Sequence, residues 1–287
     1  MKLPSFEYRR PTSLEEAVAI LSEQGGGAKL LAGGQSLIPI MAFRLANPTV
    51  LVDLGRIPGL RGIEIDDTGV HIGAMTRWRD IENDSRLAGA CPLVTAAVGH
   101  IAHYQIRNRG TIGGNLSHAD PASEMPGVAV ACDARLEVVG PSGTRYVEAQ
   151  DFFTGTLSTC LAYDEILRAV HFPSWPGRRR WAFEEFALRR GDFAYAGIAL
   201  SYDEADAGLA SNVRVAVIGA TDIPRRLPSV EAAIAGHRVD GSLIEEAAQI
   251  AAASVSPPDD IHASADYRRA LVATLVSRAL TAAANRS

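Results

Sequence analysis

Two pairs of adjacent glycines are the residues of this sequence best suited to hold a ligand. Gly33 and Gly34 follow a short apolar run, and Gly113 and Gly114 follow the β-favouring dipeptide Thr111-Ile112. A glycine adopts positive φ readily, and because it lacks a Cβ it lets the backbone approach a bulky group. Successive exposed N–H groups then form a concavity that binds phosphate. The pairs predict a phosphate-bearing ligand, whereas a single pair is most often a tight turn.

Polar side chains follow both glycine pairs, namely Gln35-Ser36 and Asn115. Two such loops could hold a diphosphate together with a polar ring system. Neither pair lies in a G-x-G-x-x-G segment that opens a helix, and no G-x-x-x-x-G-K-[ST] segment occurs in the chain. These absences argue against a Rossmann or P-loop nucleotide site.

Other candidate chemistry is weaker. His100 and His103 are three residues apart at a predicted helix end, but no third metal ligand is evident, so ordinary surface or core histidines are expected. The three cysteines, Cys91, Cys132 and Cys160, form no CxxC and are too few for an iron–sulfur cluster, which normally takes four. We expect free thiols in a reducing cytosol.

Composition is that of an ordinary globular protein. The chain has 287 residues, 47% of them hydrophobic, and a net charge of −5, which gives no footprint for nucleic acid or an anionic membrane. No apolar window reaches the length of a membrane span, and the N-terminus has no apolar signal-peptide region. We therefore expect a cytoplasmic protein without a membrane span.

The first glycine pair is expected at the end of a strand in a small βαβ unit. Capping residues and apolar spacing predict a helix over 11–24 and a buried strand over 28–32. A helix over 37–45 and a second strand over 50–54 follow.

The second glycine pair is expected inside a mixed α+β subdomain. Turn residues predict hairpins that join 63–65 to 70–72 and 136–139 to 145–147, and a helix covers 92–101. The Pro-, Gly- and Arg-rich segment 173–180 is the best boundary candidate. Beyond it we expect strands and then helices, namely strands over 194–202 and 213–218 and helices over 230–235, 242–254 and 265–284.

Longer stretches around both glycine pairs resemble a known family. Residues 29–39, with Arg44 and 51–54, are similar to the first flavin motif of the medium subunits of molybdenum hydroxylases. Residues 107–115, followed by 119–121, resemble the second motif, and residues 189–194 resemble a third. The similarity runs from about residue 3 to the end. The family includes carbon monoxide dehydrogenase medium chains and the central segment of xanthine dehydrogenases.

The resemblance implies an α+β fold with two domains. Residues 1–176 would form a PCMH-type FAD-binding domain like that of vanillyl-alcohol oxidase, with subdomains of about 1–56 and 57–176. Residues 177–287 would form a C-terminal α+β domain like that of carbon monoxide dehydrogenase flavoproteins. FAD would lie extended in the cleft, and two loops, residues 32–36 and 111–115, would grip its diphosphate through backbone N–H groups.

Individual residues carry further implications from the family. Glu124 would contact the adenosine end, Leu167 would pack beside the adenine, and Phe193 would lie near the isoalloxazine, unless it is an ordinary core aromatic residue. The cofactor-binding residues expected on this basis are Lys29, Leu31, Ala32, Gly33, Gly34, Gln35, Ser36, Leu37, Thr111, Ile112, Gly113, Gly114, Asn115, Glu124, Leu167 and Phe193. The xanthine dehydrogenase branch has a lysine where this chain has Glu185, so that contact is not transferred.

The implied activity is electron relay. A large molybdopterin-binding subunit would oxidise a small molecule, and two [2Fe–2S] clusters in a small subunit would pass electrons to a non-covalent FAD and on to an external acceptor. A dimer of heterotrimers would be the assembly. Relatives process carbon monoxide, aldehydes, purines such as caffeine and N-heterocycles such as nicotine. A stand-alone FAD-dependent oxidase or reductase and a flavin-free scaffold subunit of the same fold are the alternatives.

Overall fold

A parallel three-stranded sheet forms the N-terminal lobe of the computed structural model, which describes residues 2–286. In chain order its elements are β1 (Glu7–Arg9), α1 (Leu14–Gln24), β2 (Ala28–Leu31), α2 (Leu37–Ala42), β3 (Val50–Asp53) and the 3₁₀ turn η1 (Leu54–Arg56). The strand order β1-β3-β2 makes β2, α2 and β3 the expected βαβ unit. The Ser13 Oγ caps α1 by accepting the Glu16 N–H at 3.2 Å.

The central region is built on an antiparallel sheet in the order β4-β5-β10-β6-β7. Its strands are β4 (Ile63–Asp66), β5 (Gly69–Gly73), β6 (Arg135–Gly140), β7 (Gly143–Glu148) and β10 (Ile166–Pro173), beside a small hairpin of β8 (Phe153–Gly155) and β9 (Ser158–Thr159). Both predicted hairpins are confirmed. The central strand β10 was not predicted, because a bulge between Leu167 and Ala169 breaks the alternation that marks a strand.

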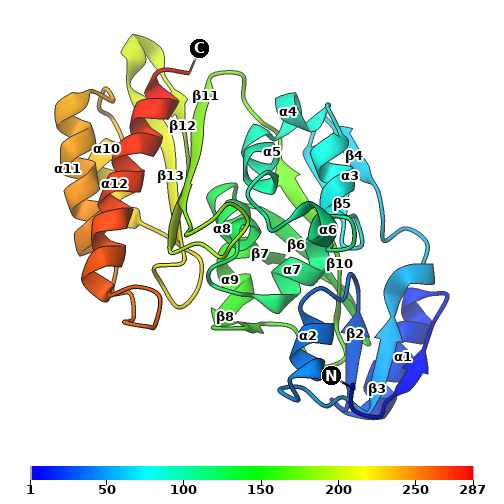
Figure 1. The fold of residues 1–287 in the computed structure, drawn as a ribbon. Helices are drawn as coiled ribbons and strands as arrows, with labels where there is room; N and C mark the ends of the chain where they lie inside the picture. The colour runs from blue at the N-terminus through cyan, green and yellow to red at the C-terminus, as the bar shows by residue number, and fades with distance from the viewer. Residues whose placement is uncertain (1, 287) are drawn as a thin grey trace.

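Helices cover one face of this sheet (Figure 1). They are α3 (Trp78–Asn83), α4 (Leu87–Ala90), α5 (Pro92–Val98), α6 (Tyr104–Arg107), α7 (Ile112–His118), α8 (Glu124–Ala131) and α9 (Ala149–Phe152). Every residue of α8 is buried, as expected of a helix enclosed on all sides.

A second antiparallel sheet, β11-β12-β13-β14, forms the C-terminal region. Its strands are β11 (Arg179–Phe186), β12 (Ala196–Glu204), β13 (Ala210–Ile218) and β14 (Arg225–Arg226), with the 3₁₀ turn η2 (Asp206–Gly208) after β12. Three helices then follow, α10 (Pro228–Ile234), α11 (Gly241–Ala253) and α12 (Ala265–Ala284). The predicted order of strands and then helices is confirmed, although β11 was missed because its charged residues mask the pattern.

The C-terminal sheet is covered on both faces. The three C-terminal helices lie on one face, and α8 packs on the other (Figure 1). The approach of α8 is close, because a Cβ on Gly127 would lie 2.2 Å from the Ile218 Cγ1. One hydrophobic core therefore runs from the central region into this sheet and includes Ala199 and Ala216. Within residues 2–286, no helix is both long and apolar enough to cross a bilayer.

Candidate cofactor-binding site

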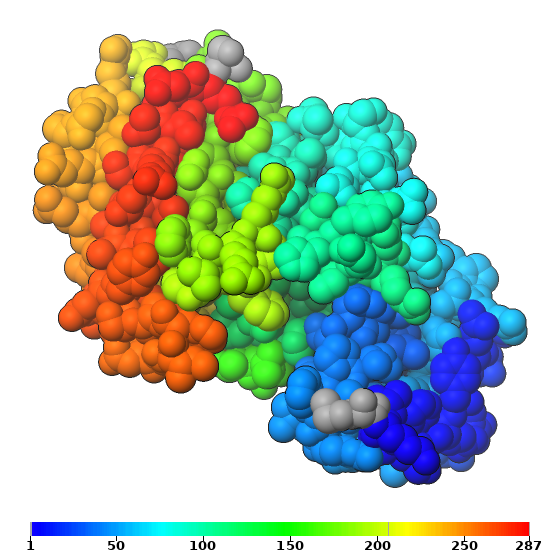
Figure 2. All heavy atoms as spheres, in the orientation of Figure 1, coloured from blue at the N-terminus to red at the C-terminus, as the bar shows by residue number. Residues whose placement is uncertain are grey.

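A cleft of about 2020 Å³ runs between the N-terminal lobe, the central region and the C-terminal region. In Figure 2 the N-terminal lobe, in blue, meets the green central region along this face, with the yellow-green segment that follows β11 above the junction. Pockets for drug-sized ligands measure about 300–1,000 Å³, so this cleft suits a larger molecule such as a dinucleotide.

The two glycine motifs, defined here as residues 32–36 and 109–115, meet at the wall of this cleft. A Cβ on Gly33 would lie 2.3 Å from the Arg109 carbonyl oxygen and 2.8 Å from the Gly110 Cα. A Cβ on Gly114 would lie 3.5 Å from the Ala32 Cβ. Two segments that are far apart in the sequence are therefore in direct contact.

The first glycine motif forms a cradle of backbone N–H groups. Gly34 has φ +72°, which turns the chain between β2 and α2. Within residues 2–286, the N–H groups of residues 33–36 have no backbone or side-chain acceptor. Gln35 folds back so that its Nε2 donates to the Gly33 carbonyl at 3.2 Å. Consecutive N–H groups without acceptors are the arrangement that binds a phosphate oxygen.

The second glycine motif differs from the expectation. Thr111 caps α7, and the glycines lie in the first turn of that helix, not in a loop. The N–H groups of Ile112 and Gly113 donate to the carbonyls of Thr76 and Ala74 at 3.1 and 2.8 Å. Those of residues 114 and 115 donate to the Thr111 Oγ1 and carbonyl oxygen at 3.2 and 3.1 Å. The prediction of a loop that presents these four N–H groups to a ligand is therefore wrong.

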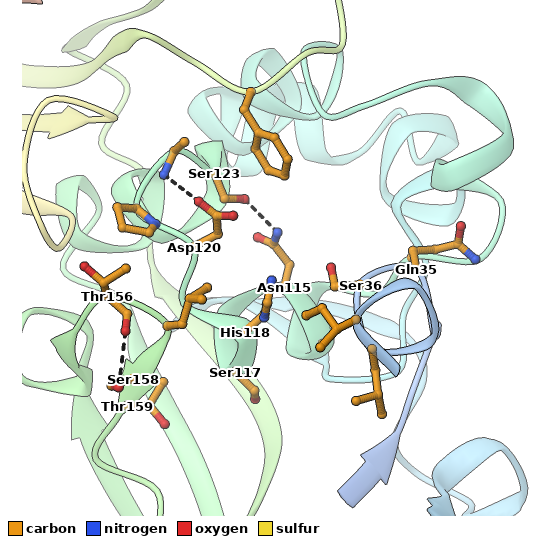
Figure 3. Close-up of a pocket in the computed structure, with 18 of the residues that line it drawn as sticks. Gln35, Ser36, Asn115, Ser117, His118, Asp120, Ser123, Thr156, Ser158 and Thr159 are labelled. Atoms are coloured by element: carbon orange, nitrogen blue, oxygen red, sulfur yellow. Dashed lines mark hydrogen bonds between the residues drawn. The ribbon is translucent and has the colours of Figure 1, made fainter. Parts of the chain in front are cut away.

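Asn115 is the part of the second motif that carries free hydrogen-bonding capacity into the cleft. Its Nδ2 donates to the Ser123 Oγ at 2.7 Å (Figure 3). Its Oδ1 is buried and, within residues 2–286, has no donor. A buried acceptor without a donor is costly, so this atom fits a hydroxyl or N–H group of a bound molecule.

Glu124 lines the same wall and is 5% exposed. Burial, followed by repulsion from Glu185, raises the pKa of Glu124 to about 8. At neutral pH this carboxyl group holds its proton and can both donate and accept hydrogen bonds. The Glu185 side chain is also buried; its Oε1 lies 3.7 Å from the His100 Nδ1, and its Oε2 has no hydrogen-bond partner within residues 2–286.

The remaining predicted residues are divided between the cleft and the core. Lys29, Leu37, Leu167 and Phe193 line the cleft together with most residues of the two glycine motifs, whereas Leu31 and Ile112 do not. Ile112 is fully buried in the central core. Phe193 is 65% exposed, so the alternative reading of an ordinary core aromatic is wrong.

Two groups of lining residues were not predicted from the sequence. The first is the run of hydroxyl side chains around the β8–β9 turn, where Thr156, Ser158 and Thr159 face the cleft (Figure 3). In the sequence, only the composition of this run could have indicated that it lines the cleft. The second comes from the C-terminal region and includes Asp260, His262 and Arg268. These residues reach the cleft only through tertiary packing. Among the side chains of residues 2–205 and 207–286, no three His, Cys, Asp or Glu residues are grouped to hold a metal ion.

Family models and known proteins match this chain over nearly its whole length. Residues 4–175 match the family model described as the FAD binding domain in molybdopterin dehydrogenase, and residues 181–283 match the CO dehydrogenase flavoprotein C-terminal domain. The nicotine 6-hydroxylase medium subunit of Paenarthrobacter nicotinovorans is 42% identical over 100% of both chains. The carbon monoxide dehydrogenase medium chain of Hydrogenophaga pseudoflava is 38% identical over 98% of this chain and 97% of that one. A solved structure of carbon monoxide dehydrogenase from the same organism superposes with a TM-score of 0.96 over 99% of this chain and 98% of that chain, at 39% identity.

Proposed function

The chain belongs to the family of FAD-binding medium subunits of molybdenum hydroxylases, and we propose that its cleft holds one FAD for electron transfer between protein partners. The observation that carries this proposal is the contact between the two glycine motifs beside a cradle of four N–H groups without acceptors. Bound FAD would supply the redox chemistry, and the chain would bind it, orient it and limit access to it.

The two glycine motifs would have different tasks. The N–H groups of residues 33–36 would receive the diphosphate oxygens, because these four consecutive groups have no acceptor within residues 2–286. The second motif would support this cradle from behind through the contact of Arg109 and Gly110 with Gly33. Asn115 would accept a hydrogen bond from a hydroxyl or ring N–H group through its Oδ1.

Three further residues would act along the length of the cleft. The protonated Glu124 carboxyl would donate to, and accept from, a sugar hydroxyl. Leu167 would pack beside the adenine. The exposed Phe193 ring would cover part of the isoalloxazine and limit which acceptor reaches it.

The relatives named above are medium subunits or chains of multi-subunit enzymes. We propose a large molybdopterin-binding subunit and a small subunit with two [2Fe–2S] clusters as partners, assembled as a dimer of heterotrimers. Such clusters are each held by four ligands, typically cysteines, and this chain has three cysteines, none of them in a disulfide. Free thiols also favour a reducing compartment, which we propose is the cytoplasm.

The substrate of the whole complex would be chosen by the molybdenum subunit. Relatives that match this chain over at least 97% of their own sequences are named for nicotine and for carbon monoxide, two very different molecules. We propose that the medium subunit serves the same relay in each, with a small molecule of the carbon monoxide, aldehyde, purine or N-heterocycle classes oxidised elsewhere.

Purification of the full chain tests the cofactor. We expect a yellow protein with one FAD per chain, released on denaturation and bleached by dithionite. A folded, colourless chain that takes up no added FAD would contradict the proposal and favour a flavin-free scaffold. Co-purification of a tagged chain with its neighbours tests the relay: turnover of a small substrate by the isolated chain would favour a stand-alone oxidase or reductase.

A further inference from the structure

Two histidines form a close pair on the outer face of the central sheet, away from the cleft. His71 on β5 and His171 on β10 are register partners. Their Nδ1 atoms lie 2.6 Å apart, and their ring centroids are 4.8 Å apart. Neither residue lines the cleft, so the pair has no part in the cofactor site.

The Nε2 atom of His171, which points away from His71, acts as a hydrogen-bond donor. Its Nε2 lies 3.0 Å from the Glu137 Oε2, and the Glu137 Oε1 receives the Arg168 Nη1 at 2.7 Å. A carboxylate in an ion pair with arginine only accepts hydrogen bonds. The His171 Nε2 must therefore carry a hydrogen.

The Nε2 atom of His71 acts as a hydrogen-bond donor as well. Its Nε2 lies 2.9 Å from the Thr68 Oγ1, and that hydroxyl donates its only hydrogen to the Asp66 Oδ1 at 2.6 Å. Hydrogen bonds from the Thr68 side chain and backbone lower the pKa of Asp66 to about 2, so this carboxylate is an acceptor. The Thr68 oxygen must in turn accept the hydrogen of the His71 Nε2.

The two Nδ1 atoms, which face each other, then cannot form a hydrogen bond while both rings are neutral. A neutral imidazole carries one N–H, so both Nδ1 atoms would present lone pairs to each other across 2.6 Å. A proton or a metal ion between the two Nδ1 atoms would remove the repulsion between their lone pairs. A tetrahedral zinc ion with bonds of about 2.0–2.1 Å would hold its two nitrogens about 3.3 Å apart, which is wider than the observed gap. A hydrogen bond fits the gap.

We propose that His71 and His171 share one proton between their Nδ1 atoms and so form a cationic clamp between β5 and β10. The protonated ring donates and the neutral ring accepts, so the two rings together carry one positive charge. The clamp closes only while this proton is bound, which makes it a proton-operated device on the sheet.

The charges around the clamp favour a cation. The charged and titratable groups on this face are Glu64 and Asp66 on β4, Arg168 on β10, Arg135 and Glu137 on β6, and Tyr146 and Glu148 on β7. The four carboxylates outnumber the two guanidinium groups, so the charge on this face favours a bound proton. Arg135 is further engaged with the Tyr146 ring, with its Cζ 4.8 Å from the ring centroid.

The clamp also lies behind the wall of the cleft. The strand that carries His171 supplies Ile166 and Leu167 to that wall, and its bulge lies between Leu167 and Ala169. Glu137 connects Arg168, next to the bulge, to His171. Loss of the proton would loosen this end of β10. This link to the cleft rests on the proposed function, whereas the clamp itself does not.

Nuclear magnetic resonance of the full chain with ¹⁵N-labelled histidine tests the shared proton directly. We expect one strongly deshielded N–H proton associated with the His71–His171 pair, absent from His71→Ala. Two neutral rings at pH 6 would overturn the proposal. Retention of one equivalent of added Zn²⁺ by the wild-type chain, but not by His71→Ala, would also overturn it, by making the pair a metal site.

A matched variant tests the clamp by stability. In His71→Asn, an amide N–H stands near the Nδ1 position and can donate to His171 without an extra proton. The wild-type clamp needs a bound proton and the His71→Asn contact does not, so the unfolding equilibrium constant of the wild type is expected to rise about tenfold more than that of His71→Asn when the pH is raised. The exposed His237→Asn serves as the control and should follow the wild type. Equal pH dependence in the wild type and His71→Asn would overturn the clamp.

The same variants separate the clamp from the proposed function. If the clamp supports the cleft wall, flavin retention by the wild type falls with pH more steeply than retention by His71→Asn. A chain that binds no flavin would contradict the proposed function and leave the resonance and stability results to decide the clamp.

Discussion

The backbone of Gly33 lies directly against the backbone of Arg109, so that a Cβ on Gly33 would stand 2.3 Å from the Arg109 carbonyl oxygen. No real Cβ tolerates that distance. Gly33 is therefore required by contact between the two glycine motifs, while its own N–H group remains without an acceptor within residues 2–286. The same residue joins the motifs and contributes to the cradle.

Substitution Gly33→Ala should separate the motifs. The added methyl group must displace backbone, which costs about 1–3 kcal/mol of unfolding free energy. We expect FAD affinity to fall at least tenfold, measured by fluorescence titration of the deflavinated chain. Gly89→Ala is the control, because a Cβ on Gly89 in α4 meets nothing within 4 Å. It should bind FAD normally and gain a few tenths of a kcal/mol in stability. Unchanged FAD affinity in Gly33→Ala would contradict this role of the contact.

The cap of α7 gives a second prediction. Thr111→Val keeps the shape of the side chain but removes the oxygen that accepts the Gly114 N–H at 3.2 Å. Loss of a helix cap costs about 1 kcal/mol, and here it also loosens the support of the cradle. We expect a clear loss of FAD affinity as well as of thermal stability.

A cap elsewhere provides the comparison for Thr111→Val. Ser13→Ala removes the acceptor that caps α1, where the Ser13 Oγ receives the Glu16 N–H at 3.2 Å. It should lose similar stability without loss of FAD affinity, because Ser13 does not line the cleft. Equal FAD affinities in the two variants would mean that the α7 cap has no specific part in the site.

The sequence predicted the first glycine motif better than the second. Residues 33–36 do form a cradle between a strand and a helix, as local turn chemistry suggests. Residues 112–118 form a helix although glycine disfavours helices by about 1 kcal/mol per residue. The reason is tertiary: a Cβ on Gly113 would lie 2.4 Å from the Ala74 Cβ, so only glycine allows α7 to pack there. Such a contact cannot be read from local sequence.

The other features that were not predicted from the sequence depend on contacts between residues far apart in the chain. The bulge in β10 disguised the central strand, and without that strand the pairing of His71 with His171 could not be seen. The residues Asp260, His262 and Arg268 reach the cleft because the C-terminal sheet packs on α8, which periodicity does not reveal. Elements with strong local signals, such as α12 behind its Ser264 cap, were predicted closely.

Phe193 gives a third prediction. Its side chain is 65% exposed at the cleft, so Phe193→Ala should change the unfolding free energy by no more than about 0.5 kcal/mol. If the ring covers the isoalloxazine, its removal should increase the fluorescence of bound flavin and speed reduction of artificial acceptors. Leu188→Ala, also at an exposed cleft position, has no aromatic ring to remove and should leave the fluorescence unchanged. Equal fluorescence in both variants would remove Phe193 from the isoalloxazine.

Glu124 gives a prediction about pH. Burial and the neighbouring Glu185 raise its pKa from the ordinary 4.5 to about 8 in the folded chain. Between these values the folded state binds a proton that the unfolded state has released, so stability is highest below about pH 4.5, falls as pH rises, and levels off above about pH 8. Glu124→Gln cannot ionise. It should match the wild type near pH 5 and exceed it by about 3 kcal/mol near pH 8, measured by urea denaturation.

Two comparisons separate this effect from other titrations. Glu246→Gln removes an exposed carboxylate of the same type from α11 and should keep the wild-type pH profile. Both glutamate variants retain His71 and His171, so any contribution of that pair cancels between them. The amide introduced by Glu124→Gln can still both donate and accept a hydrogen bond, and FAD affinity at pH 6 should therefore remain within about threefold of the wild type. Parallel stability profiles for the wild type and Glu124→Gln would show that Glu124 is ionised in the folded chain and that its role as a hydrogen-bond donor is wrong.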